Sequence, residues 1–139
     1  MYRNTEGYID PTAGQAMSQV MREYKWSRWY RYADKNRRKV YIASRYAGDI
    51  EGNVDAAIRY CQYAIREGYM PIASHLLYPQ MLNDTNPQER ELGLRFGLAL
   101  LALCDEVWVF GVPSYGMMNE IDEARRLCKK IRYFREGCV

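Results

Sequence analysis

From Val40 onward, short apolar runs alternate with longer amphipathic stretches. The short runs predict strands over Val40–Ser44, Met70–Ala73, Asp105–Phe110 and Ile131–Phe134. Between them, apolar positions recur every three to four residues, which predicts helices over about 53–67, 86–103 and 116–130. Because parallel neighbouring strands need crossover connections, this order predicts a parallel sheet with helices on both faces.

Local signals support the helices and suggest which faces they bury. Asn86 and Pro87 begin one helix, with Glu89 completing a capping box, and Gly68 ends another. The apolar stripe expected for helix 53–67 consists of Val54, Ala57, Ile58, Cys61, Ala64 and Ile65. The inner face expected for the last helix consists of Ile121, Ala124, Leu127 and Cys128.

The fold class expected from this pattern is α/β, a small flavodoxin-like or Rossmann-like three-layer sandwich with four to five parallel strands. Residues 39–139 would form this domain. Residues 1–38 would be a basic, aromatic-rich helical extension, in which Asp10 and Pro11 begin a helix.

Charge is unevenly distributed between these two parts. Residues 1–39 carry nine Lys and Arg against four acids, whereas the rest of the chain carries a net charge of −2. In residues 22–39 basic side chains alternate with Trp and Tyr, a composition that suits single-stranded nucleic acid through stacking and phosphate contacts. The alternative, which we favour, is a helix that packs on the body or on another subunit.

Other features narrow the class of protein. No apolar run has the length of a membrane span, and the polar first residues do not resemble a secretion signal, so we expect a cytoplasmic protein without a membrane partner. Its four cysteines form no C-x-x-C pair, so we expect reduced, packing thiols and no metal site. Neither a dinucleotide fingerprint nor a P-loop is present.

The candidate catalytic and binding residues lie mostly in the loops that follow the predicted strands, where parallel sheets bind ligands. The segment Ser114–Glu120 follows a buried strand, passes through Gly116 and opens a helix. Helix N-termini favour anions, so Ser114 and Gly116 are candidates to hold a phosphate, unless Ser114 is only a cap. Glu120 is a candidate nucleophile or base, or alternatively a partner of the helix dipole.

The earlier loops add further candidates. Tyr41, in the first strand, would orient Glu120 or simply pack. Ser44, Arg45 and Gly48 follow that strand and would contact phosphate or ribose, the alternative for Arg45 and Gly48 being a solvated turn. His75, the single histidine, follows the second strand and is a candidate substrate contact rather than a metal ligand.

These segments resemble the nucleoside 2-deoxyribosyltransferase-like superfamily over residues 39–134, and within it uncharacterised phage and Gram-positive bacterial proteins of the DUF4406/DUF7768 type. The resemblance rests on Tyr41–Asp49, Pro71–Leu77 and Cys104–Glu120. It implies that Tyr41 and Glu120 form the catalytic core. The Ser114-x-Gly116 pattern resembles the branch of the superfamily that hydrolyses nucleoside monophosphates, with Met118 standing where that branch has a second glycine.

The resemblance implies an N-glycosidase or 2-deoxyribosyltransferase that acts on nucleoside 5′-monophosphates, needs no cofactor and assembles as a homo-oligomer. One departure is the aspartate that known members carry in the helix before the third strand, since residues 95–99 contain no acid. Glu91 or Asp84 would have to substitute. The alternative function is therefore a non-catalytic nucleotide-binding protein, a sensor or a sequestering protein.

Overall fold

The computed structural model describes residue 19, residues 36–137 and residue 139. The helix expected from Asp10 and most of the basic aromatic segment lie outside the described residues. The unit Arg38–Val139 contains the whole predicted α/β body. Within the described residues, no helix is both long and apolar enough to cross a membrane.

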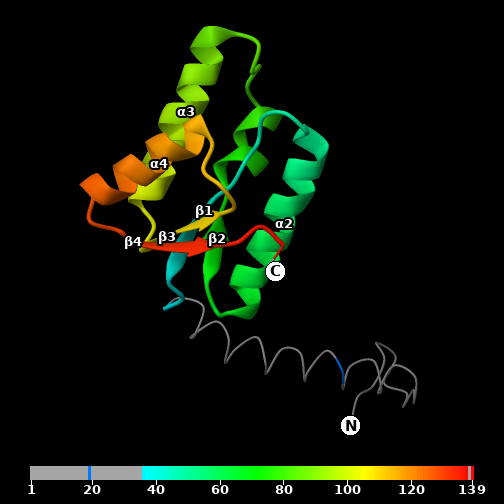
Figure 1. The fold of residues 1–139 in the computed structure, drawn as a ribbon. Helices are drawn as coiled ribbons and strands as arrows, with labels where there is room; N and C mark the ends of the chain where they lie inside the picture. The colour runs from blue at the N-terminus through cyan, green and yellow to red at the C-terminus, as the bar shows by residue number, and fades with distance from the viewer. Residues whose placement is uncertain (1–18, 20–35, 138) are drawn as a thin grey trace, which may run out of the picture. The chain divides into compact units, whose positions relative to one another are not determined.

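The body is a four-stranded parallel sheet in the order β2-β1-β3-β4 (Figure 1). Its strands are β1 (Lys39–Ala43), β2 (Met70–Ile72), β3 (Glu106–Phe110) and β4 (Lys130–Phe134). They alternate with the helices α2 (Ile50–Arg66), α3 (Pro87–Ala102) and α4 (Tyr115–Arg126). Two short 3₁₀ turns, Ser74–Leu76 and Tyr78–Gln80, occupy the loop after β2. The predicted fold class is confirmed.

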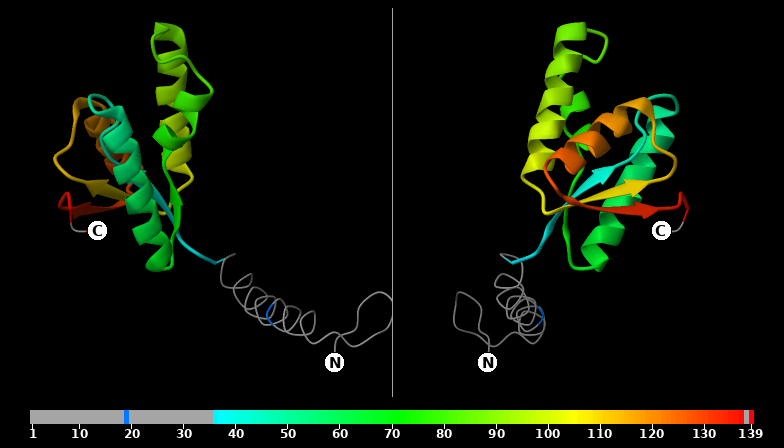
Figure 2. Two further views of the ribbon diagram at one scale, coloured as in Figure 1. Left: turned by 90° about the vertical axis from the view of Figure 1, so that its right-hand side faces the viewer. Right: turned by 60° about the vertical axis from the view of Figure 1, so that its left-hand side comes forward.

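Alternate residues of each strand enter opposite layers, as the period of two in a strand requires. Val40, Ile42, Trp108 and Phe110 pack against α2, where the ring of Tyr60 stacks on Phe110. The intervening residues Tyr41, Ala43, Val107 and Val109 pack with Leu101 of α3 and with Met117, Ile121 and Ala124 of α4. Figure 2 shows α2 on one side of the sheet and α3 and α4 on the other. The core of each layer therefore follows from the strand sequences.

Two predicted helix faces are confirmed only in part. In α2, Ala57 and Ala64 are buried as expected and Tyr60 is buried as well, whereas Ile58 and Ile65 are 42% and 50% exposed. The Tyr60 ring, stacked on Phe110, occupies part of the buried face. In α4, Ile121 and Ala124 are buried as expected and Leu127 packs against the same core. Cys128 is exposed, because α4 ends at Arg126 and Cys128 takes the left-handed φ of 55° that closes the helix.

α2 also begins earlier than predicted. Gly48 has a φ of 96°, a value that glycine adopts without strain, and Asp49 then caps the helix by accepting from the backbone N–H of Gly52 at 3.1 Å. The last residues of the segment expected to be a turn thus begin a helix, and Gly48 supplies the backbone conformation that precedes its cap.

Candidate functional site

The hydroxyl groups of Tyr41 and Ser74 meet toward the carboxyl ends of the parallel strands, with Tyr41 Oη 2.7 Å from Ser74 Oγ. Tyr41 lies in the inner strand β1 and is fully buried, while Ser74 is the second residue after β2. Because β1 and β2 are parallel neighbours, their ends bring the two side chains together. The candidate site is built around this pair.

Glu120, in α4, faces the same tyrosine. Burial raises the pKa of the Glu120 carboxyl to about 8, and a hydrogen bond from Tyr41 opposes this by favouring the charged form. Burial and the nearby charge of Glu120 in turn raise the pKa of Tyr41 well above its usual value. Within the described residues, Oε2 of Glu120 is buried and has no hydrogen-bond partner. The structure thus brings Tyr41 and Glu120 together and leaves one carboxyl oxygen of Glu120 without a hydrogen-bond partner among the described residues.

α3 approaches this group at Gly97. A Cβ at position 97 would lie 3.1 Å from Ser74 Oγ and 3.4 Å from Tyr41 Oη, so the close approach of the helix depends on glycine. α3 therefore offers no acid next to the Tyr41–Ser74 pair. Glu91 is six residues earlier, about 9 Å along the helix axis at 1.5 Å per residue.

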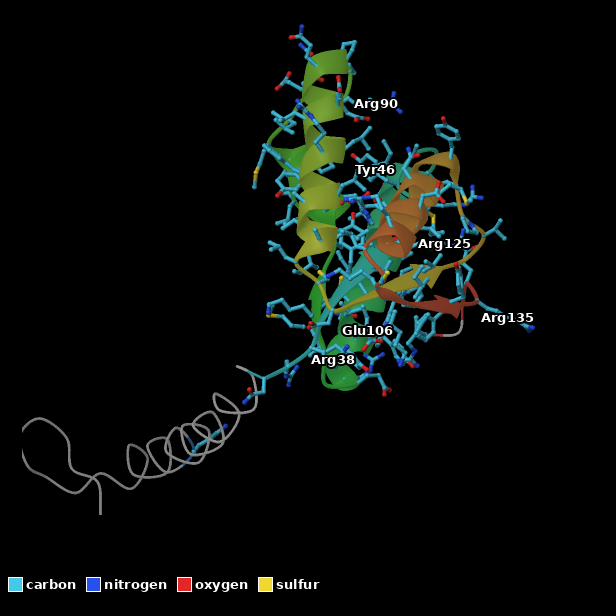
Figure 3. All side chains as sticks on the ribbon, turned by 90° about the vertical axis from the view of Figure 1, so that its left-hand side faces the viewer. Arg38, Tyr46, Arg90, Glu106, Arg125 and Arg135 are labelled. Atoms are coloured by element: carbon cyan, nitrogen blue, oxygen red, sulfur yellow. The ribbon has the colours of Figure 1, made fainter. Side chains whose placement is uncertain are left out.

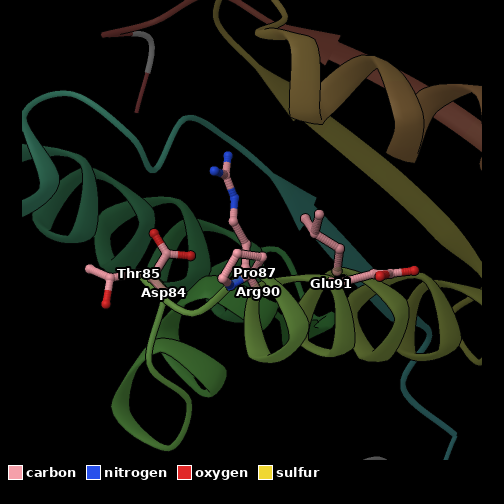
Figure 4. A pocket seen from close by; sticks show the side chains of 6 residues that line it. Asp84, Thr85, Pro87, Arg90 and Glu91 are labelled. Atoms are coloured by element: carbon pink, nitrogen blue, oxygen red, sulfur yellow. The ribbon is translucent and has the colours of Figure 1, made fainter.

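Asp84 and Glu91 instead line a hollow of about 210 Å³ at the start of α3, together with Thr85, Pro87, Arg90 and Leu94. Figure 4 shows Arg90 directed away from α3, on the side where β1 ends and its following loop runs, while Glu91 extends along the helix. In Figure 3, Arg90 and Tyr46 lie at one end of the sheet, and Arg38 and Glu106 lie at the other.

Ser44 and His75 form a second polar pair beside the first. Ser44 Oγ lies 3.3 Å from His75 Nε2, and the His75 ring is 5.9 Å from the ring of Tyr46. Burial lowers the pKa of His75 to about 4, so the imidazole is neutral at pH 7 and can accept or donate a hydrogen bond without carrying charge. As His75 follows Ser74 directly, the two pairs adjoin.

The loop from β3 to α4 supplies the features expected of an anion site. Ser114 caps α4, but its Oγ accepts from the Met117 N–H at a long 3.4 Å. Arg45 reaches across from the end of β1, and its Nε donates to the carbonyl oxygen of Val112 at 3.4 Å. A cation and a weakly engaged hydroxyl thus lie at the N-terminal end of a helix, where the dipole favours anions.

Gly116 and Met118 are exposed in the first turn of α4. Nothing lies within 4 Å of a Cβ built at Gly116, and the N–H of Met118 bonds to the Ser114 carbonyl oxygen at 3.0 Å. Neither residue packs against the Tyr41–Glu120 pair in this structure.

Within the described ranges, no group of three His, Cys, Asp or Glu side chains is placed to hold a metal. Burial raises the pKa of both Cys61 and Cys104 to about 11, which keeps these thiols protonated and unreactive at pH 7.

Two residues of this site, Ser74 and Gly97, were not singled out from the sequence as site residues. Ser74 is the second residue after β2, as Ser44 is the first after β1, so both serines lie just beyond a strand end. Gly97 is a glycine inside an apolar helix, a pattern that usually marks a close backbone approach. Both signals are present in the sequence.

The comparisons with known proteins agree with the fold. A family model described as a domain of unknown function, DUF7768, matches residues 38–134. The structure is similar to that of a 2-deoxyribosyltransferase from the psychrotolerant bacterium Bacillus psychrosaccharolyticus, with a TM-score of 0.59 and 15% identity over 73% of this chain and 75% of that one. At this identity the likeness concerns the fold. No curated protein matches the chain.

Proposed function

This chain belongs to the DUF7768 family of domains of unknown function, and we propose that it is a nucleotide N-glycosidase or deoxyribosyltransferase acting on nucleoside 5′-monophosphates. The observation that carries the proposal is the buried, unpartnered Oε2 of Glu120 beside the Tyr41 hydroxyl. A nucleophilic carboxylate needs such a free oxygen, shielded from water and oriented by a neighbour.

In this mechanism the Glu120 carboxylate attacks the anomeric carbon and forms a glycosyl ester. The bond from sugar to base breaks, and the base leaves with that electron pair and takes a proton from water. Water or a second base then attacks the same carbon and releases Glu120. The hydrogen bond from Tyr41 keeps more of Glu120 ionised than burial alone would allow.

The phosphate would bind at the start of α4, to Ser114 and the first N–H groups of the helix, with Arg45 contacting the carbonyl oxygen of Val112 in the preceding loop. Ser44 and His75 would contact the sugar from the loops after β1 and β2. A fold shared with a 2-deoxyribosyltransferase supports a glycosyl-transfer chemistry at this end of the strands, and the proposed site needs no cofactor.

A second function follows from Gly97. The helix that meets the Tyr41–Ser74 pair brings no acid there to protonate a leaving base. A protein that binds a nucleotide without cleaving it, as a sensor or by sequestering it, would keep the phosphate site and need no such acid.

Release of free base from a panel of ribo- and deoxyribonucleoside 5′-monophosphates tests the proposal, with Glu120→Gln as the inactive variant. We expect release by the wild type that falls by at least about 100-fold in Glu120→Gln. Ser114→Ala should weaken nucleotide binding, whereas Asn86→Ala, which removes the better-bonded cap of α3 (2.9 and 3.2 Å), should lower only stability. Binding without any release would favour the second function, and the absence of both would contradict each.

A further inference from the structure

The face of α3 that touches the Tyr41–Ser74 pair continues past the sheet. Arg90, Leu94 and Gly97 are spaced by four and three residues and so share one face of the helix. Gly97 lies against Ser74 and Tyr41, and Leu94 and Arg90 line the hollow of about 210 Å³ farther along. At 1.5 Å per residue, the Cα of Arg90 lies about 10 Å beyond that of Gly97.

The fold gives Arg90 no stabilising role. It lies in the first residues of α3, where a positive charge opposes the helix dipole. It is exposed, and in the part of the chain that the structure describes it forms no ion pair, although Asp84 and Glu91 line the same hollow. Figures 3 and 4 show its side chain directed toward the side on which the loops after the strands lie.

The surroundings of Arg90 determine what it can bind. A guanidinium has donors only, so its partner must be an acceptor. The carboxylates of Asp84 and Glu91 give the hollow a net negative charge, which disfavours a phosphate there. Leu94, 55% exposed, adds an apolar surface to the same wall. A flat, neutral ring that bears a carbonyl oxygen fits this combination.

We propose that Arg90 selects the base of the bound nucleotide by donating to an exocyclic carbonyl oxygen, so that 6-oxopurines and 4-oxopyrimidines bind better than their amino counterparts. The inference rests on the proposed function. With the sugar at Glu120 and the phosphate at the start of α4, the base extends along α3 from Gly97 over Leu94. An amino group at that position would present a donor to a donor.

Two matched pairs of ligands test this, inosine against adenosine 5′-monophosphate and uridine against cytidine 5′-monophosphate, because the members of each pair differ chiefly in the oxo or amino group. Dissociation constants are measured by calorimetry on the full chain, for the wild type, Arg90→Met and Arg95→Met. Arg95 is a matched control, exposed on the same helix but turned about 140° away. We expect the wild type to favour the oxo member by about 10-fold, the usual scale for a hydrogen bond to a charged group.

That preference should vanish in Arg90→Met and persist in Arg95→Met. An unchanged preference in Arg90→Met, or an equal loss of affinity for both members of each pair, would overturn the role of Arg90 and leave the proposed function standing. Failure of the wild type to bind any of the four nucleotides or their 2′-deoxy counterparts would overturn the proposed function together with the inference.

Discussion

The reactivity of single residues in this site depends on the balance between burial and hydrogen bonding. Burial alone would hold Glu120 protonated at pH 7, since transfer of a carboxylate away from water disfavours its charge. Tyr41 opposes this by hydrogen bonding to the charged form. The same burial keeps His75 neutral. The protonation states of Glu120 and His75 are thus set by their surroundings.

Replacing Tyr41 by Phe should shift the pH dependence of base release. The nucleophile must be ionised, so the kcat/KM of the wild type should rise with pH through about 8, the pKa to which burial raises Glu120. Without the hydrogen bond from Tyr41 the midpoint should move upward by about one unit. Rates measured from pH 6 to pH 10 check this. Ser114→Ala serves as the control, with weaker binding and an unmoved midpoint; a midpoint that stays in place in Tyr41→Phe would show that the hydroxyl does not act on Glu120.

Whole elements were predicted well where their buried faces follow a simple period. The strands β1 and β3 are continuous apolar runs, and such runs fit the middle of a parallel sheet. The start of α2 and the end of α4 were missed, because Gly48 and Gly52 resemble a turn and the apolar period continues past Arg126 to Cys128. In the site, Tyr41 and Glu120 were candidates from their places in a strand and at a helix start, and the resemblance added that they act together. The sequence carries signals for Ser74 and Gly97, but only their three-dimensional contacts show that these two residues meet Tyr41.

The two glycines of α3 give a matched test of that close contact. Gly93→Ala should stabilise the protein by about 0.5–1 kcal/mol, because alanine favours a helix and a Cβ there meets Leu82 at an ordinary 3.4 Å. Gly97→Ala gains the same helix propensity but presses on Ser74 Oγ at 3.1 Å, so we expect little net gain in stability and a large loss of base release or nucleotide binding. Thermal unfolding and nucleotide titration of both variants check this. Equal behaviour of the two would show that α3 is not tightly fitted at Gly97.

In the described α/β body, the buried carboxyl groups of Glu106 and Glu120 lie at opposite ends of the parallel strands, and their pKa values are shifted in opposite directions. At the amino end of β3, Glu106 is 1% exposed and accepts hydrogen bonds from Arg38 Nε at 3.0 Å and from Trp108 Nε1 at 3.3 Å. Burial acts to raise the pKa of Glu106, but the hydrogen bonds from Trp108 and Arg38 outweigh it and hold the pKa below its usual value. Near the carboxyl ends of the strands, burial raises the pKa of Glu120 to about 8, and its Oε2 has no hydrogen-bond partner among the described residues.

The free energy of unfolding should therefore pass through a maximum near pH 4.5, the usual pKa of both carboxyl groups. Glu106 contributes stability above pH 4.5, its usual pKa, and that contribution is lost as the pH falls through its lowered folded value. Glu120 binds its proton more tightly in the folded state, so its contribution is present at low pH and is lost as the pH rises from 4.5 to about 8. Urea denaturation between about pH 2 and pH 9 measures both limbs of the curve.

Each limb should respond to one variant. Glu120→Gln should flatten the alkaline limb and stabilise the protein at pH 8 by on the order of 2 kcal/mol, because it removes the cost of burying a charge. Glu106→Gln should flatten the acid limb and destabilise the protein at pH 7 by about 1–3 kcal/mol, because the guanidinium of Arg38 loses its anion. If Glu120→Gln left the alkaline limb unchanged, the carboxylate would be hydrated in the folded state. It would then lack the shielded environment on which the proposed nucleophile depends.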